Sequence, residues 1–156
     1  IACRCDDQVS SNDTSALPRQ HQVRSQLQAT AKIMRILYIE DSPANLKLVR
    51  EIIDNIPNYH LYEACEPKLG LELAIAHRPD LILLDINLPG LDGYEVLKAL
   101  RETASLSTIP VYAISANAMA ADRKHGLEAG FNEYITKPLD VTRFIEALQK
   151  AELAMS

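Results

Sequence analysis

From Met34 to about Leu153 the chain alternates short apolar runs with amphipathic stretches, five times in succession. A run of bulky apolar residues bounded by turn signals predicts a strand buried on both faces, as in a parallel sheet. The intervening stretches repeat their apolar residues at helical spacing, which predicts one buried face on each helix. Five strand–helix units in about 120 residues predict an α/β fold, with helices on both faces of a parallel sheet and right-handed crossovers.

Turn and capping residues locate these elements along the chain. The predicted strands span residues 34–39, 58–64, 80–84, 110–115 and 131–136. The predicted helices span residues 43–56, 67–77, 93–103, 118–129 and 140–153. Ser42 and Pro43 are typical of a helix start, and Gly130 of a helix end. We expect the first two helices to bury Leu46, Val49, Ile52, Ile53 and Ile56, and Leu69, Leu73 and Ile75 or Ala76.

The topology that this pattern favours is a flavodoxin-like (βα)5 doubly wound sandwich, with a parallel sheet in the order 2-1-3-4-5. Ligands of such sheets bind beyond the carboxyl ends of the strands, at the switch point between the first and third strands. Glu40 and Asp41 follow the first strand, and Asp85 ends the apolar run of the third. Because parallel strands end at one edge, we expect these acids to share one crevice.

Three carboxylates at one edge predict a divalent cation, because charges without a partner are costly to hold away from water. Mg²⁺ prefers oxygen ligands and is usually bound by one or two carboxylates together with a phosphate, while Mn²⁺ is the second candidate ion. Asp41 and Asp85 could bind the ion directly, Glu40 directly or through water, and the Asn87 backbone carbonyl lies two residues further on. Each of the first two acids could instead only cap the helix that begins at Pro43.

Asp85 could also act as a nucleophile, since a carboxylate can attack a phosphoryl group and form an acyl phosphate. Two further strand ends carry groups that bind phosphoryl oxygens. Ser115 offers a hydroxyl beside the small Ala116, and Lys137 offers a compact positive charge before Pro138. Alone, such residues are usually turn, cap or surface residues, so only the whole set is specific.

Together these residues resemble the receiver domain of bacterial two-component phosphorelays, over about residues 35–153. The family's landmarks occur in order, as Glu40-Asp41, Asp85 with Pro89 and Gly93 behind it, Ser115, and Lys137-Pro138. The acidic pair is Glu-Asp rather than Asp-Asp, and the switch hydroxyl is Ser rather than Thr. Neither change removes the chemistry. The stretches 38–45 and 114–119 look most like receivers of bacterial hybrid sensor histidine kinases.

The resemblance implies a function for each of these positions. Asp85 would accept a phosphoryl group from the phosphohistidine of a partner, with Mg²⁺ held by Asp41, Asp85 and the Asn87 carbonyl. The phosphoryl oxygens would be bound by Ser115, Lys137 and the Ala116 backbone. Tyr134 matches the family's switch aromatic, which turns inward when the serine moves toward the phosphate.

The implied partner is a histidine kinase or a histidine phosphotransfer domain, which the family docks against the first helix beside the active-site rim. We expect this partner to contact Ala44, Leu48 and Pro138. A dimer through the helix 118–129, the strand 131–136 and the last helix is the second expected contact. We also expect a cytoplasmic location, alone or within a membrane-attached sensor kinase.

Composition excludes some classes of partner. A net charge of −5 without a basic stripe argues against nucleic acid, and no apolar run approaches the length of a membrane span. The polar residues 1–31 are typical of a linker or disordered arm, which leaves 32–156 as the receiver domain. We expect Cys65 to be a small apolar filler, Met119 to pack, and the four histidines to be solvated.

Three other functions fit part of the pattern. A free-standing single-domain response regulator would carry the same site. A Mg²⁺-dependent aspartyl-phosphate phosphatase or phosphotransferase would usually have a second acid where Asn87 stands, and a cap insertion. A flavin-binding protein would need a Ser/Thr/Gly-rich loop at 40–43. We therefore expect a regulatory domain that catalyses only its own phosphorylation and dephosphorylation, not an enzyme acting on outside substrates.

Overall fold

Five parallel strands form one sheet in the order β2-β1-β3-β4-β5, as predicted. The computed structural model describes residues 32–155, so the predicted arm at 1–31 lies outside the described residues. The strands are β1 (Met34–Ile39), β2 (Tyr59–Ala64), β3 (Leu81–Asp85), β4 (Val111–Ser115) and β5 (Glu133–Thr136). The helices are α2 (Pro43–Asp54), α3 (Pro67–His77), α4 (Gly93–Glu102), α5 (Ala120–Ala129) and α6 (Val141–Met155).

Capping residues define several helix ends. The Ser42 hydroxyl accepts from the Asn45 N–H at the start of α2, and Asp92 forms a capping box with Glu95 at the start of α4. Gly130 ends α5 with a φ of 115°, a conformation that favours glycine. These ends match the predicted ones to within a few residues. The largest differences are two residues: α5 starts at Ala120 instead of residue 118, α2 ends at Asp54 instead of residue 56, and α6 ends at Met155 instead of residue 153.

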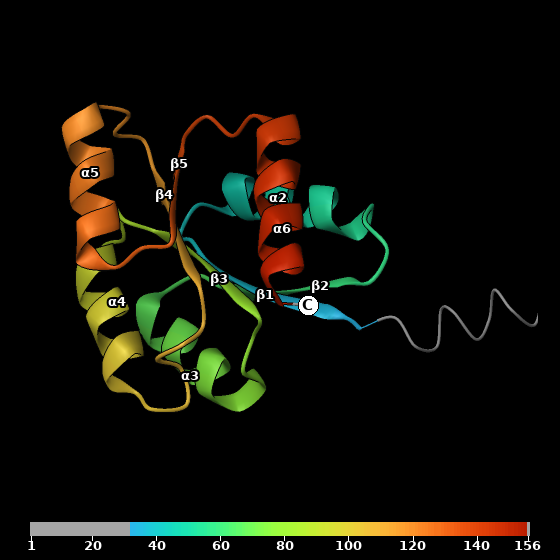
Figure 1. The fold of residues 1–156 in the computed structure, drawn as a ribbon, viewed down its shortest axis with the longest axis horizontal. Coiled ribbons are helices and arrows are strands. Elements are labelled where there is room, and N and C mark those ends of the chain that lie inside the picture. Colours follow the sequence, from blue (N-terminus) through green and yellow to red (C-terminus); the bar gives the residue numbers. More distant parts are fainter. Residues whose placement is uncertain (1–31, 156) are drawn as a thin grey trace, which may run out of the picture. The chain divides into compact units, whose positions relative to one another are not determined.

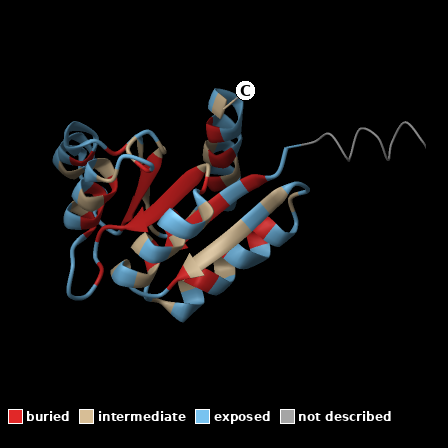
Figure 2. Cartoon of the chain, turned by 90° about the horizontal axis from the view of Figure 1, so that it is seen from below, coloured by how far each residue is buried: buried red, intermediate tan, exposed pale blue. Residues whose placement is uncertain are grey.

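The core consists of two apolar clusters, one on each face of the sheet. On one face the strands pack against α2 and α6, and on the other against α3, α4 and α5 (Figure 1). The inner strands β3 and β4 are buried throughout and β1 is buried except at Arg35, whereas the edge strand β2 is mostly half-buried (Figure 2). Among residues 32–155 no helix is both long and apolar enough to cross a membrane.

Three predicted packing positions are wrong. α3 buries Gly70 and Ala74, while Ile75 and Ala76 are exposed. The reason is close packing through small residues, since a Cβ on Gly70 would clash with the Ile39 side chain. Contrary to expectation, the structure also exposes the side chains of Cys65 and Met119. The described histidines lie at the surface and make ring contacts with tyrosines, as between His77 and Tyr62.

Candidate phosphoacceptor and metal site

The carboxyl ends of β1 and β3 bring three acids together. Ile39 pairs with Leu84 in the sheet, so the residues that follow, Glu40 and Asp85, are neighbours. Both are buried, at 1% and 2% exposed, whereas Asp41 faces solvent. One carboxylate oxygen from each acid lies within 4.8 Å of the others. Three acids this close need a positive charge among them.

Lys137 supplies one positive charge from the end of β5. Its ammonium lies 2.9 Å from Glu40 Oε2 and 3.0 Å from Asp85 Oδ2. Burial lowers the pKa of Lys137, but hydrogen bonds to both acids outweigh burial and raise it, so the lysine stays charged. Its backbone N–H donates to the Ser115 carbonyl, and the peptide bond to Pro138 is cis.

The two buried acids differ in their donors. Burial raises the pKa of Asp85, against the opposing hydrogen bonds from the Asn87 N–H (3.0 Å) and Lys137. Burial acts on Glu40 in the same sense, but hydrogen bonds from Lys137 and from the hydroxyl of Tyr38 leave its pKa lowered. The Tyr38 hydroxyl lies 2.9 Å from Glu40 Oε2. The sequence signal for this contact is the two-residue spacing, which puts Tyr38 and Glu40 on one face of the sheet, whereas the apolar run around Tyr38 indicates only a strand.

Ser115 lies at the end of β4, next to the acids. It is fully buried, and its hydroxyl oxygen accepts from the Asn117 N–H over 3.1 Å. That bond uses a lone pair and leaves the hydroxyl proton free to be donated. Ala116, the next residue, is exposed. The structure thus brings a hydroxyl donor, an ammonium and the acids to one edge of the sheet.

Tyr134 lies on the face of β5 that packs against α3, α4 and α5. Its ring is buried with the cluster under α3, α4 and α5, and a Cβ on Gly126 of α5 would lie 2.7 Å from it. Its hydroxyl donates to the Asn117 carbonyl over 2.9 Å. Asn117 therefore contacts Ser115 through its N–H and Tyr134 through its carbonyl, so the loop before α5 joins the two residues.

The predicted docking residues lie on α2 and in the loop after β5. Ala44 on α2 and Pro138 after β5 are exposed. Leu48 on α2 is half-buried against the cluster under α2 and α6, so its side chain is only partly accessible to a partner.

The donor set fits a hard divalent cation. The three clustered side chains offer only carboxylate oxygens, the ligands that Mg²⁺ and Mn²⁺ accept. Lys137 offsets one of their negative charges, which leaves a net negative site. Asp41, which has the only exposed carboxylate of the three, is the residue through which an ion could enter.

Residues 36–149 match the family model described as the response regulator receiver domain. The chain belongs to this family. Receivers are signalling domains of two-component systems, so the predicted family and function class are confirmed. The finer likeness to receivers of hybrid sensor kinases stays a prediction.

Similar proteins agree with this assignment. The polar-differentiation response regulator DivK of Brucella anthropi is 42% identical over 117 residues, which cover 73% of this chain and 92% of that protein. The receiver domain of a sensor histidine kinase from Pseudomonas aeruginosa PAO1 is 30% identical, with a TM-score of 0.68, over 76% of this chain and 96% of that one. Its active-site cleft coordinates a magnesium ion.

The fold also resembles that of a chemotaxis receiver. The response regulator CheY4 of Vibrio cholerae superposes with a TM-score of 0.71 at 22% identity, over 77% of this chain and 99% of that one. This likeness supports the (βα)5 fold alone.

Proposed function

We propose that Asp85 accepts a phosphoryl group from the phosphohistidine of a partner protein. The observation that supports this role is the contact of Lys137 with Asp85 and Glu40 at the edge of the sheet where Ser115 also lies. An Asp85 carboxylate oxygen attacks phosphorus, a new P–O bond forms, and the P–N bond to the partner's imidazole breaks. The imidazole takes up a proton from solvent as the P–N bond breaks and leaves as a neutral group.

The chain's own residues bind the transferred group. Lys137 moves its positive charge from the Asp85 carboxylate to a phosphoryl oxygen, which keeps the buried charge paired. The Ser115 hydroxyl and the Ala116 N–H donate to the other oxygens. Mg²⁺, or Mn²⁺ in its place, held by Asp41, Asp85 and the Asn87 carbonyl, would offset the negative charge of the two reacting groups. Glu40 would contact this ion directly or through water.

The same contacts support a conformational switch. When Ser115 turns toward the phosphoryl group, the Asn117 N–H loses its acceptor. Because the Asn117 carbonyl accepts a hydrogen bond from the Tyr134 hydroxyl, a movement of Asn117 also displaces Tyr134 on β5 and the start of α5. A domain of this kind regulates other proteins and catalyses only its own phosphorylation and dephosphorylation.

The proposed partner is a histidine kinase or a histidine phosphotransfer domain that contacts Ala44, Leu48 and Pro138. Ala44 and Pro138 are exposed. Ala44 and Leu48 follow the acids of the site closely along the chain, and Pro138 directly follows Lys137. The free thiol of Cys65 suits a reducing compartment, which supports the cytoplasm as the location.

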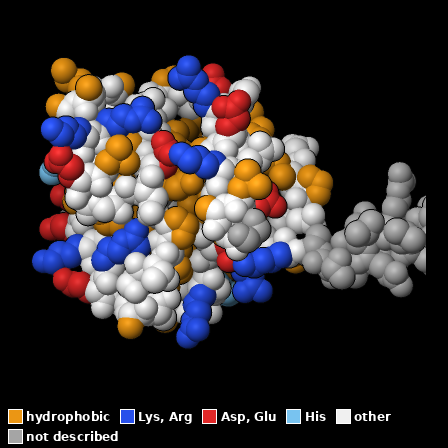
Figure 3. All heavy atoms as spheres, in the orientation of Figure 1, with side chains coloured by type: hydrophobic (Ala, Val, Ile, Leu, Met, Phe, Trp, Pro, Cys, Tyr) orange, Lys and Arg blue, Asp and Glu red, His pale blue; other side chains and the backbone are white. Residues whose placement is uncertain are grey.

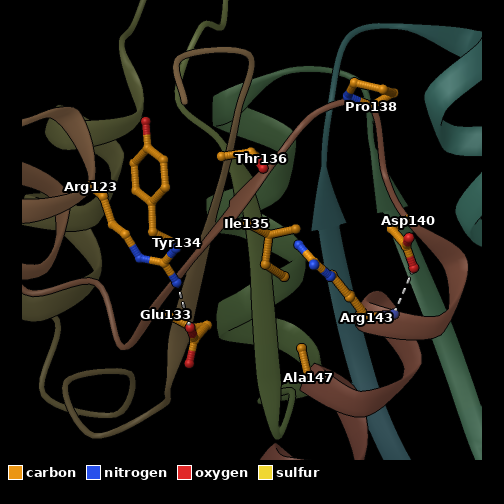
Figure 4. Close-up of a pocket in the computed structure, with 9 residues that line it drawn as sticks. All are labelled: Arg123, Glu133, Tyr134, Ile135, Thr136, Pro138, Asp140, Arg143 and Ala147. Atoms are coloured by element: carbon orange, nitrogen blue, oxygen red, sulfur yellow. Dashed lines mark hydrogen bonds and ion pairs between the residues drawn. The ribbon is translucent and has the colours of Figure 1, made fainter. Parts of the chain in front are cut away.

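A dimer through α5, β5 and α6 is a second proposed contact. A hollow of 220 Å³ lies between these elements, with Ile135 and Ala147 among its lining residues (Figure 4). Arg123 and Arg143 lie on opposite sides of Ile135 (Figure 4), and the surface view shows apolar side chains between Lys and Arg side chains on this face (Figure 3). Glu133 and Asp140 supply charges of the opposite sign. Sedimentation at increasing concentration, with and without phosphorylation, tests this contact.

Incubation with acetyl phosphate and Mg²⁺ tests the function. We expect a mass increase of one phosphoryl group per chain, which is absent without the metal and in Asp85→Asn. Repeated hydrolysis of an outside phosphate ester, or an adduct that survives in Asp85→Asn, would instead favour a phosphatase or another acceptor residue.

A further inference from the structure

Tyr38 is a buried tyrosine to which the phosphoryl chemistry gives no role. It lies on β1 two residues before Glu40, so both side chains lie on the same face of the sheet. The ring is fully buried in the cluster under α2 and α6, and the hydroxyl donates to Glu40 Oε2 over 2.9 Å. Burying a hydroxyl is costly unless it is hydrogen-bonded, and here its partner is a carboxylate of the metal site.

Glu40 is held by three donors from three parts of the chain. Oε2 accepts from Tyr38 and from Lys137, and Oε1 accepts from the Ser42 N–H over 3.2 Å. Lys137 is the donor that moves when a phosphoryl group arrives, because its ammonium then pairs with a phosphoryl oxygen. Tyr38 cannot follow, since its ring is fixed in the core. It is therefore the permanent partner of Oε2.

We propose that Tyr38 is a positioning residue of the metal site, which keeps the Glu40 carboxylate from turning onto the ion and so favours Mg²⁺ over Ca²⁺. Mg²⁺ keeps several waters and needs few carboxylates, whereas Ca²⁺ takes more oxygen ligands in flexible geometry. A Glu40 side chain that is free to move would add carboxylate oxygens to the ligands of the ion. These would strengthen the binding of Ca²⁺ more than that of Mg²⁺. The inference rests on the proposed function for the presence of an ion, and of the two modes given there for Glu40 it selects the one through water.

Tyr38→Phe tests this role, because it removes only the hydroxyl. Calorimetric titration of the unphosphorylated protein with Mg²⁺ and with Ca²⁺ gives the two dissociation constants. We expect their ratio to move toward Ca²⁺ by about threefold or more. Tyr112→Phe is the matched control, since Tyr112 is a buried tyrosine of the same cluster on β4 and is not a partner of Glu40. Its ratio should equal the native one.

A double-mutant cycle shows whether Tyr38 acts through Glu40. In a Glu40→Gln background, Tyr38→Phe should change the ratio no further. A native ratio in Tyr38→Phe, or the same shift in the absence of the Glu40 carboxylate, overturns the proposal. If circular dichroism shows that Tyr38→Phe does not fold, Glu40→Asp withdraws the carboxylate from the hydroxyl and leaves the core intact. The same shift is then expected, and an unchanged ratio overturns the proposal.

These titrations separate the inference from the phosphoryl chemistry, because they use no phosphodonor. A shifted ratio in a protein that is not phosphorylated on Asp85 would refute the proposed function and leave the inference standing. Normal phosphorylation with an unchanged ratio would refute the inference alone. A native protein that binds neither ion would refute both.

Discussion

Two neighbouring buried acids, Glu40 and Asp85, have pKa values shifted in opposite directions. Burial acts to raise both values. Glu40 has donors from the core, from β5 and from the chain ahead of α2, so its charged form is favoured. Asp85 has fewer donors and lies beside the Glu40 charge, so its charged form is disfavoured. Of these two acids, the one proposed to receive the phosphoryl group is therefore the one whose charged form the fold stabilises less.

Asp85→Asn should stabilise the fold at neutral pH. With a raised folded-state pKa, Asp85 binds its proton more tightly in the folded protein, so its contribution to stability grows as the pH falls and is unfavourable at neutral pH. We expect the thermal midpoint to rise by roughly 2–6 °C at neutral pH, measured by circular dichroism. The difference should shrink as the pH falls toward 3.8, the ordinary Asp value.

Glu40→Gln is the matched control for this prediction. The pKa of Glu40 is lowered, so its carboxylate contributes stability that is present above its ordinary value of 4.5 and lost as the pH falls through the folded-state value. At neutral pH the substitution should lower the midpoint. A midpoint below the native one in Asp85→Asn would contradict the assignment of opposite shifts.

The sequence predicts which residues form most of the site. Acids, a hydroxyl and a lysine at the ends of apolar runs meet because parallel strands end at one edge of a sheet. The contact of Tyr38 with Glu40 depends on which way two side chains turn, and the strand pattern does not specify that. The partial burial of Leu48 depends likewise on how α2 is rotated on the sheet.

Arg101 connects α4 to the loop before β4 and to the loop after α5. Its guanidinium donates to the carbonyls of Ser107 (3.1 Å) and Ile109 (2.7 Å), before β4. It also donates to the Gly130 carbonyl and to Asn132 Oδ1, between α5 and β5. These contacts fix the carboxyl end of α5 at the edge of the sheet away from the acids. The amino end of α5, which follows Asn117, is the end that the proposed switch moves.

Arg101→Met should destabilise the fold, because four acceptors lose a charged donor. We expect the free energy of unfolding to fall by about 1–3 kcal/mol in urea denaturation. Arg50→Met is the control, since Arg50 pairs with Glu63 through two hydrogen bonds at the surface and should matter little. Equal effects of the two substitutions would show that Arg101 does not connect the elements as described.

Element boundaries were predicted well where capping residues mark them, as at Ser42 and Gly130. The packing of α3 follows the prediction only in part: Leu69 and Leu73 pack against the core as expected, but Ile75 and Ala76 do not. Helical spacing favours large apolar residues as the buried face. Contact with the sheet instead occurs through Gly70 and Ala74, whose small size allows a closer approach. Such a choice depends on the distance between helix and sheet, which a single sequence does not give.

For the whole molecule, the proposed function requires a surface for the phosphoryl donor and another for the response. Ala44 and Pro138 are exposed on the elements that follow Asp41 and Lys137. The hollow between α5, β5 and α6 is lined by Tyr134, which the structure connects to Ser115 through Asn117. The proposed donor surface is therefore connected to the acidic site through Asp41 and Lys137, and the proposed response surface is connected to it through Ser115.

Leu48→Arg should slow phosphoryl transfer from the partner by about tenfold, since a charge at the centre of an interface typically costs more than 1 kcal/mol. Phosphorylation by acetyl phosphate, which needs no docking, should be unchanged. Leu127→Arg on α5 is the control, because Leu127 is 45% exposed and lies away from the proposed contact. Equal transfer rates in native protein and Leu48→Arg would exclude Leu48 from the docking surface.

The proposed function requires that phosphorus becomes covalently bound to one acid of the cluster at the carboxyl edge of the sheet. Borohydride reduces an acyl phosphate to an alcohol, so mass spectrometry of the reduced, digested protein identifies the acid that carried it. After treatment with acetyl phosphate and Mg²⁺ we predict homoserine at position 85 and an unchanged residue at 41. Reduction at Asp41, or at no acid while the adduct is present, would contradict the account.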